Sequence, residues 1–186
     1  MDSINFPQLG AGTLLIAVMA LVPVSAHAEI SGPCSQAVGT YLTKNTLDNS
    51  GQSGTSRSIL ALTNGGHAIR FDSDEDGAAM DSRPFGDSAG TWRCDGVDKD
   101  GTVRLTATML DFTFPDAEGD SGQIARIDVM GTYTPETGLM ALTGKLGFLP
   151  MRADAQKADA LSQASSTTLI SLRGTKIELP EAKAAE

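Results

Sequence analysis

The chain has 186 residues and a net charge of −9 at pH 7, with 23 acidic against 14 basic side chains. An acidic surface disfavours nucleic acid and anionic lipid as partners, because both carry negative charge. The two histidines and two cysteines are too few for a zinc or haem ligand set, and no glycine-rich phosphate loop is present, so we expect no cofactor.

The N-terminal segment has the pattern of a secretory signal peptide. Residues 14–24 form an apolar run that is shorter than the roughly 20 residues needed to span a bilayer. Ala-His-Ala at 26–28 matches a small-x-small cleavage site. Residues 1–10 hold no Lys or Arg, which departs from the pattern and leaves an uncleaved anchor as the alternative. We expect residues 1–28 to be removed and the mature protein to be periplasmic or secreted, without membrane attachment.

The two cysteines of the chain are Cys34 and Cys94. Outside the cytoplasm such a pair is oxidised, so we expect one disulfide bond between them. The bond would close a long loop and stabilise the fold by a few kcal/mol in the chain-entropy model. Two free buried thiols are the alternative if the protein is not exported.

Short apolar runs separated by Thr, Gly, Ser and Asp are typical of antiparallel sheet. Asn-Gly-Gly at 64–66 and Pro-Glu-Thr-Gly at 135–138 are turn signals between such runs. We expect one β domain over residues 29–179 and a disordered tail over 180–186. The expected strands are residues 37–44, 56–63, 67–72, 90–94, 102–114, 123–134, 139–149 and 167–179.

One apolar face per strand and one hairpin after another favour a closed up-and-down antiparallel barrel of about eight strands. A β-sandwich is the alternative. A barrel of this size is either filled by its own side chains or holds one small ligand. The small residues Gly131, Gly144, Ala107 and Ala125 fall on predicted inner faces, which would leave room for a cavity.

The strand at residues 67–72 alternates between an apolar and a charged face. His67 and Phe71 share one face, and Arg70 and Asp72 share the other. Because a sheet buries its apolar face, we expect His67 and Phe71 to point inward. An inward histidine would suit a general base or a ligand donor, and a partly exposed residue after the turn is the alternative.

A further candidate for an inward-facing acid is Asp111. It is in phase with Ala107 and Met109, whereas Leu110 and Phe112 fall out of step, and a β-bulge near Met109 would explain the change. If Asp111 enters the barrel, burial would raise its pKa and suit it to acid–base chemistry. Rotation to the outer face by the bulge is the alternative.

Asp72, Asp74 and Asp76 match the first half of a calcium loop, D-x-D-x-D-G. The twelfth position, which should carry a bidentate acid, is Arg83, and no helices flank the segment. We therefore expect a solvated acidic loop and no metal site, with these three aspartates as the calcium candidates.

Residues 86–90 fit the G-x-S-x-G pattern around Ser88. The pattern needs a strand-to-helix turn and a histidine after the serine, whereas His67, the one histidine beyond the signal segment, precedes Ser88. The sequence therefore does not support a serine hydrolase.

Gly90-Thr91-Trp92 resembles the G-x-W motif of lipocalins and other calycins. In that family the Trp closes one end of a ligand-binding barrel and an Arg near the last strand stacks on it, which implies that role for Arg173. The family's motif lies on the first strand and is accompanied by a C-terminal helix, and this chain departs from both features. The whole chain also resembles exported bacterial β-proteins. The resemblance implies a barrel and names no ligand.

Three functions remain open at this stage. The first is an exported barrel that binds a small apolar molecule, the second is a cofactor-independent cyclase or isomerase acting in a barrel cavity, and the third is an envelope interaction or inhibitor protein. For an enzyme, the expected catalytic residues are Asp111, His67 and Tyr133. For a binding protein, the expected ligand-binding residues are Phe71, Trp92, Met109, Tyr133, Leu142 and Phe148.

Overall fold

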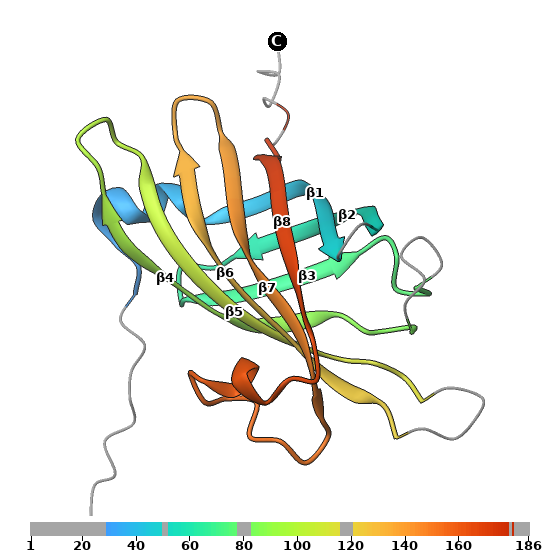
Figure 1. The fold of residues 1–186 in the computed structure, drawn as a ribbon. Helices are drawn as coiled ribbons and strands as arrows, with labels where there is room; N and C mark the ends of the chain where they lie inside the picture. Colours follow the sequence, from blue (N-terminus) through green and yellow to red (C-terminus); the bar gives the residue numbers. More distant parts are fainter. Residues whose placement is uncertain (1–28, 50–51, 78–82, 116–120, 179, 181–186) are drawn as a thin grey trace, which may run out of the picture.

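The computed structural model describes residues 29–49, 52–77, 83–115, 121–178 and 180. The expected signal peptide (1–28) and residues 181–186 of the expected tail lie outside the described residues. Eight antiparallel strands follow one another around a closed barrel, so that β1 (Gly39–Asn49) pairs with both β2 (Gln52–Leu62) and β8 (Thr167–Lys176). Figure 1 follows the chain from η1 and β1 in blue to β8 in red, which completes the barrel. The expected closed up-and-down barrel is confirmed.

The elements lie close to their expected positions. All eight expected strands are present, and β1, β2 and β4 are longer than their sequence patterns suggest. No helix in the described part of the chain has the length and apolarity to cross a membrane. The elements are η1 (Gly32–Ala37), β1 (Gly39–Asn49), β2 (Gln52–Leu62), β3 (His67–Asp72), β4 (Ser88–Val97), β5 (Val103–Phe112), β6 (Gln123–Thr134), β7 (Leu139–Pro150), η3 (Ala160–Gln163) and β8 (Thr167–Lys176).

The β-bulge that we expected near Met109 is not present. β5 pairs with β6 in unbroken register from Val103 to Phe112, and the one register shift beside β5 lies on β4, between Cys94 and Gly96. Burial alternates along the whole of β5. Of the two apolar residues that fall out of step, Leu110 packs outside the barrel and Phe112 is exposed.

A second small core explains that outward packing. Residues 151–166, orange to red in Figure 1, connect β7 to β8. Arg126, buried on the outer face of β6, donates from Nη1 to the carbonyl oxygens of Ala155 (2.7 Å) and Lys157. The connection therefore covers part of the outer wall. The apolar residues packed there are Leu110, Ile124, Leu149, Ala153, Ala155, Ala160 and Ala164.

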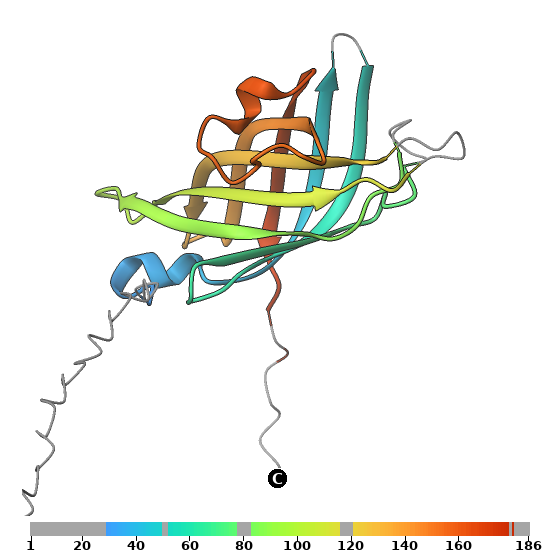
Figure 2. The same cartoon turned by 90° about the horizontal axis from the view of Figure 1, so that it is seen from below.

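The 3-10 turn η1 closes one end of the barrel. Ala37 is fully buried in the main core, and the Cys34–Cys94 disulfide joins the turn to β4. Figure 2 shows η1 in blue at the lower left, far from the upper ends of β1 and β2. The two ends of the barrel are therefore different, and the expected disulfide is confirmed.

The inward-facing glycines allow neighbouring strands to approach closely. A Cβ atom added to Gly144 would lie 1.9 Å from the carbonyl oxygen of Asp128, and one added to Gly131 would lie 2.0 Å from that of Ala141. These contacts involve backbone atoms, which cannot rotate away as a side chain can. Two of the four small residues that we assigned to a cavity, Gly131 and Gly144, are thus required by the close approach of neighbouring strands.

We expect Gly144→Ala to lower the free energy of unfolding by about 1–3 kcal/mol, because the added methyl group forces the backbones of β6 and β7 apart. Urea denaturation measures the change. Lys145→Ala, at the exposed next position, is the control and should stay within about 0.5 kcal/mol of the parent protein. Equal stability of the two variants would contradict this account of the glycine.

Breaking the disulfide should also destabilise the barrel. The bond spans a sequence separation of 60 residues, for which the chain-entropy model gives about 4 kcal/mol. We expect Cys34→Ser with Cys94→Ser to lose stability of this order in urea denaturation. A reductant should destabilise the parent protein and leave the double variant unchanged, and a parent protein insensitive to reductant would argue against the bond.

Candidate functional site

The inside of the barrel has an apolar half and a polar half. At the end closed by η1, the inward side chains are apolar and almost fully buried. Toward the other end, where β1 ends and β2 begins, the inward side chains of β1 to β5 are polar and equally buried. We call these buried residues the polar cluster, which consists of Thr43, Asn45, Ser56, Ser58, Arg70, Asp72, Ser88 and Asp111.

Four of the residues expected to bind a ligand lie inside the apolar half. Trp92, Met109, Tyr133 and Leu142 are each at most 5% exposed and belong to the main core. The indole N–H of Trp92 donates to the backbone oxygen of Thr63 (2.9 Å). Their side chains therefore fill the closed half of the barrel and stabilise it.

A tyrosine pair lies at the closed end. The rings of Tyr41 and Tyr133 meet edge to face with their centroids 5.7 Å apart, and the Tyr41 hydroxyl donates to the Ala37 oxygen (2.7 Å). Lys176 Nζ lies 5.6 Å from the centroid of the Tyr133 ring, within reach of a cation–π interaction. Burial raises the pKa of both tyrosines. Both phenols therefore stay neutral at neutral pH, and the Tyr41 hydroxyl joins η1 to the barrel.

The centre of the polar cluster is a buried ion pair between Arg70 and Asp72. Their side chains are only 6% and 1% exposed. Asn45 Nδ2 donates to Asp72 Oδ2 (2.9 Å), and the backbone N–H of Asp74 donates to Asp72 Oδ1 (3.0 Å). A buried charge is tolerated only when it is paired and hydrogen-bonded. Asp72 therefore meets this condition through three donors.

Hydroxyl and amide groups of β1 and β2 extend the cluster from Asn45. Its Nδ2 also donates to Ser56 Oγ (3.0 Å), and its Oδ1 accepts from Ser58 Oγ (3.0 Å) and from Thr43 Oγ1 (3.0 Å). The hydroxyl oxygens of Thr43 and Ser58 lie 2.7 Å apart. This network fixes the side chain of Asn45, and with it one of the partners of Asp72.

Asp111 lies inside the barrel, as its phase with Met109 predicts, and is 2% exposed. Its Oδ1 accepts from the backbone N–H groups of Gly86 (3.0 Å) and Phe112 (2.5 Å), and its Oδ2 accepts from Ser88 Oγ (3.3 Å). Burial raises the pKa of Asp111, and these hydrogen bonds and the charge of Arg70 oppose the rise. The carboxyl connects β5 to the start of β4.

Arg70 lies between two members of the polar cluster, Asp72 and Ser88. Its Nη1 lies 3.5 Å from Ser88 Oγ, and its Nη2 pairs with Asp72. Burial lowers the pKa of Arg70 to about 10, against the opposing charges of Asp111 and Glu75, so the guanidinium is still charged at neutral pH. Its Nε atom is buried and has no hydrogen-bond partner among the described residues. The Nε–H group of Arg70 is therefore an unsatisfied hydrogen-bond donor inside the barrel.

The wall opposite the polar cluster is apolar. β7 lies four strands from β3 around the eight-stranded barrel. Leu146 and Phe148 lie on the inner face of β7, the same face as the buried Leu142. Both side chains are half-buried, and so is that of Leu47 near the end of β1. Inward side chains that keep partial exposure lie near an opening. This end of the barrel therefore presents an apolar wall, which includes the expected ligand residue Phe148, opposite a polar one.

The expected orientation of β3 is wrong. Burial alternates along His67–Asp72 so that Arg70 and Asp72 are buried, while His67 and Phe71 are exposed. The charged pair points inward because its neighbours on β2 and β4 are polar groups that can satisfy it. His67 is therefore outside the barrel and distant from Asp111 as a catalytic partner, and Phe71 does not line the interior.

Two further motifs do not form the sites that their patterns suggest. Ser88 is hydrogen-bonded to Asp111 inside the barrel, but His67 is on the outer face, so no Ser-His-Asp triad is assembled. Arg173 is exposed on β8, whereas Trp92 is buried inside. The stacking implied by the calycin resemblance is therefore not formed, and the cation beside a buried aromatic ring is Lys176.

The calcium candidates are not arranged around one point. Asp72 is engaged by Arg70 and Asn45, Asp74 is buried, and Asp76 is exposed. Within the described residues, no group of three or more His, Cys, Asp or Glu side chains could hold a metal ion.

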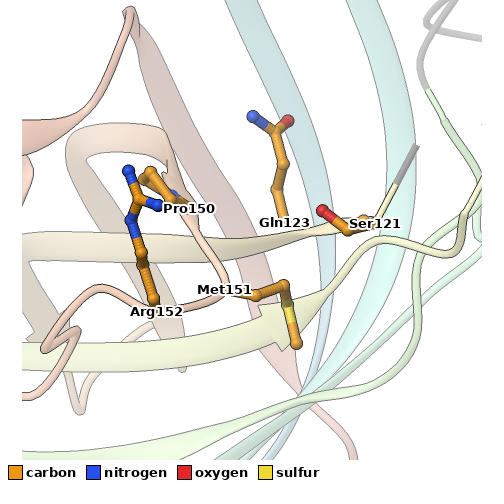
Figure 3. A pocket seen from close by; sticks show the side chains of 6 residues that line it. Ser121, Gln123, Pro150, Met151 and Arg152 are labelled. Carbon is orange, nitrogen blue, oxygen red and sulfur yellow. The ribbon is translucent and has the colours of Figure 1, made fainter.

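A shallow hollow of about 330 Å³ lies at the rim of the polar end. Its lining comes from the start of β6 and the end of β7, where Gln123 pairs with Pro150. This pair is one step along the same face from Ala125, which pairs with Asp111. Figure 3 shows Arg152 and Pro150 on one side of the hollow and Ser121 on the other. The rim at the polar end therefore carries the polar side chains Ser121, Gln123 and Arg152 beside Pro150 and Met151.

The sequence patterns missed most of the polar cluster. Arg70 and Asn45 were absent from the expected sites because a lone polar residue within a strand is usually read as solvent-facing. The signal that was present is that β1 carries Thr43 and Asn45 in phase with Tyr41. A strand with polar groups on both faces is typical of a barrel that buries some of them.

Three comparisons with known proteins found no significant match. No family model fits the chain, and no curated protein and no solved structure is similar enough to be counted.

The raised pKa of Asp111 predicts how stability changes with pH. The pKa of Asp111 in the folded protein is raised above the ordinary value of 3.8, so the folded protein binds the carboxyl proton more tightly than the unfolded chain does. The free energy of unfolding should therefore fall as the pH rises from about 3.8 through the pKa of Asp111 in the folded protein. Asp111→Asn keeps the acceptor for Gly86 and Phe112, and should remove this decline. Urea denaturation of both proteins between about pH 4 and pH 7 measures it.

Asp111→Leu is the matched control, because it also lacks the charge but offers no acceptor. It should lose about 1–3 kcal/mol at every pH, because two backbone N–H groups remain unsatisfied. If the stability difference between the parent protein and Asp111→Asn is the same at all pH values, the carboxyl titrates normally and this prediction is wrong.

Proposed function

We propose that this protein is an exported binding protein whose barrel takes up a small, mostly apolar molecule with one polar group at its polar end. The observation that carries the proposal is the buried guanidinium of Arg70, which has a spare Nε donor opposite the half-buried apolar side chains of β7. An acceptor on the ligand would satisfy that donor, and the ligand's apolar body would cover Leu146 and Phe148. The ligand-binding role of Phe148 is retained in this proposal.

Export is part of the same proposal. Its support is the signal-peptide pattern of residues 1–28 and the oxidised Cys34–Cys94 pair, because disulfide bonds persist mainly outside the cytoplasm. The calycin resemblance is also retained as a proposal. It is supported by the closed eight-stranded barrel and by the position of Trp92 near the end that η1 closes.

Native mass spectrometry of the protein purified from its own compartment tests this function. We expect a co-purifying small molecule on the parent protein. Arg70→Met combined with Asp72→Asn should lose it, since the double change removes the spare donor together with the carboxylate that pairs with it. Arg173→Met, on the outer face, is the control and should retain it.

Circular dichroism must first show that the double variant is folded. If it is not, Phe148→Ser replaces it, because this change alters only the apolar wall. A parent protein that carries no small molecule when taken from its own compartment would overturn the binding function.

A second candidate function is a cofactor-independent cyclase or isomerase. The observation that favours it is the Asp111 carboxyl, which is buried beside Ser88 and Arg70 with a raised pKa. A carboxyl whose pKa is raised is better suited to hold and donate a proton than an ordinary aspartate. If the co-purified molecule is converted by the parent protein, Asp111→Asn should still bind it and should abolish the conversion. Conversion at an unchanged rate would rule out this residue as the acid.

A further inference from the structure

The outer face of β1, β2 and β3 carries an exposed row of apolar side chains. Leu42 pairs with Ile59, and Ile59 pairs with Phe71, so the three lie side by side across adjacent strands. They are 41%, 42% and 45% exposed. Ile69, also exposed, follows on the same face of β3. We call Leu42, Ile59 and Phe71 the apolar row. Contiguous apolar surface of this kind marks interaction sites on monomeric proteins.

A row of cations lies directly beside it. Lys44 pairs with both Arg57 of β2 and Arg173 of β8, and all three side chains are exposed. Among the described residues, none of the three has an ion-pair partner. We call Lys44, Arg57 and Arg173 the basic row. It is a local concentration of positive charge on a chain whose net charge is −9.

Among the described residues of this face, no acid lies between these cations or directly beside them. The next outward positions along β1, β2 and β8 are Thr46, Thr55 and Ser171, which pair with one another and are uncharged. The first outward acid on β1 is Asp48. The face therefore presents two parallel rows, one apolar and one positive.

We propose that these two rows dock an amphipathic α-helix of a partner protein, one that carries acidic side chains beside an apolar stripe. We infer an acidic stripe on the partner helix from charge complementarity, because the three unpaired cations attract anions and repel a basic segment. The apolar row gives the neighbouring stripe. This docking surface lies outside the barrel and does not depend on the proposed function.

The spacing of the rows favours a helix that lies across the strands. Neighbouring strands are about 4.8 Å apart, and one turn of an α-helix rises about 5.4 Å. Side chains one turn apart on the helix would therefore meet successive strands of the sheet. An acid on each of three turns would face the three cations, and an apolar residue on each turn would face the apolar row.

The test uses a synthetic peptide of about 15 residues, long enough for a helix, with Glu in one stripe, Leu in the next and Ala elsewhere. Fluorescence anisotropy measures its binding to the full-length protein. We expect saturable binding that weakens as salt rises, because the contact is partly electrostatic. Lys44→Glu, Arg57→Glu and Arg173→Glu together should weaken binding at least about tenfold. The same peptide with Lys in place of Glu should not bind.

The matched control reverses three exposed cations elsewhere: Lys99→Glu, Lys145→Glu and Lys157→Glu. Its net charge equals that of the first variant, so long-range repulsion is the same in both. It should bind the peptide within about twofold of the parent protein. Ile59→Ser with Phe71→Ser should weaken binding without changing its salt dependence.

Three results would overturn the proposal. One is no binding at peptide concentrations up to about 1 mM, and another is equal loss in the two charge-reversed variants. The last is binding of this face to a membrane surface or to a second copy of the chain, in place of a helix. Vesicles containing phosphatidylglycerol that bind the protein through the basic row would identify a membrane surface. Sedimentation that shows a dimer lost in Ile59→Ser with Phe71→Ser would identify a second copy of this chain.

Discussion

The buried ion pair between Arg70 and Asp72 is the constraint around which the polar end of the barrel is organised. Two charges inside a protein are stable only if their remaining hydrogen-bonding groups are also satisfied. Asn45 supplies one of the partners of Asp72, and the hydroxyl groups around it fix its orientation. On the other side, Ser88 links Arg70 to Asp111. The cluster thus spans five adjacent strands as one network.

The sequence predicted the architecture well because a strand's alternation is local information. In the long strand, the phase of Ala107 and Met109 gave an inward Asp111 as one of two open orientations, and the structure shows Asp111 buried inside the barrel. The same reasoning inferred a bulge from Leu110. That error arose because alternation assumes one apolar environment, whereas the connection between β7 and β8 provides a second one outside the barrel.

The candidate site was much harder to predict. In β3 the apolar Phe71 was assigned inward and the charged Arg70 outward, and the structure reverses both. Hydrophobicity alone favours the assignment that was made. The deciding contribution is the set of polar partners that Arg70 meets on other strands, and these pairings depend on the register of the closed sheet. A single sequence carries no direct signal of such distant contacts, so the inward face of β3 was assigned incorrectly.

Closure of the barrel between β1 and β8 has a consequence for the timing of folding. β1 pairs with β8, so the edge of β1 that does not pair with β2 stays unpaired until β8 has been synthesised. Contacts between residues so distant in sequence form slowly. During that interval the exposed edges of β1 and of the growing sheet can pair with other chains. The barrel has no free edge once complete, and its vulnerability to aggregation is therefore concentrated in the time before β8 arrives.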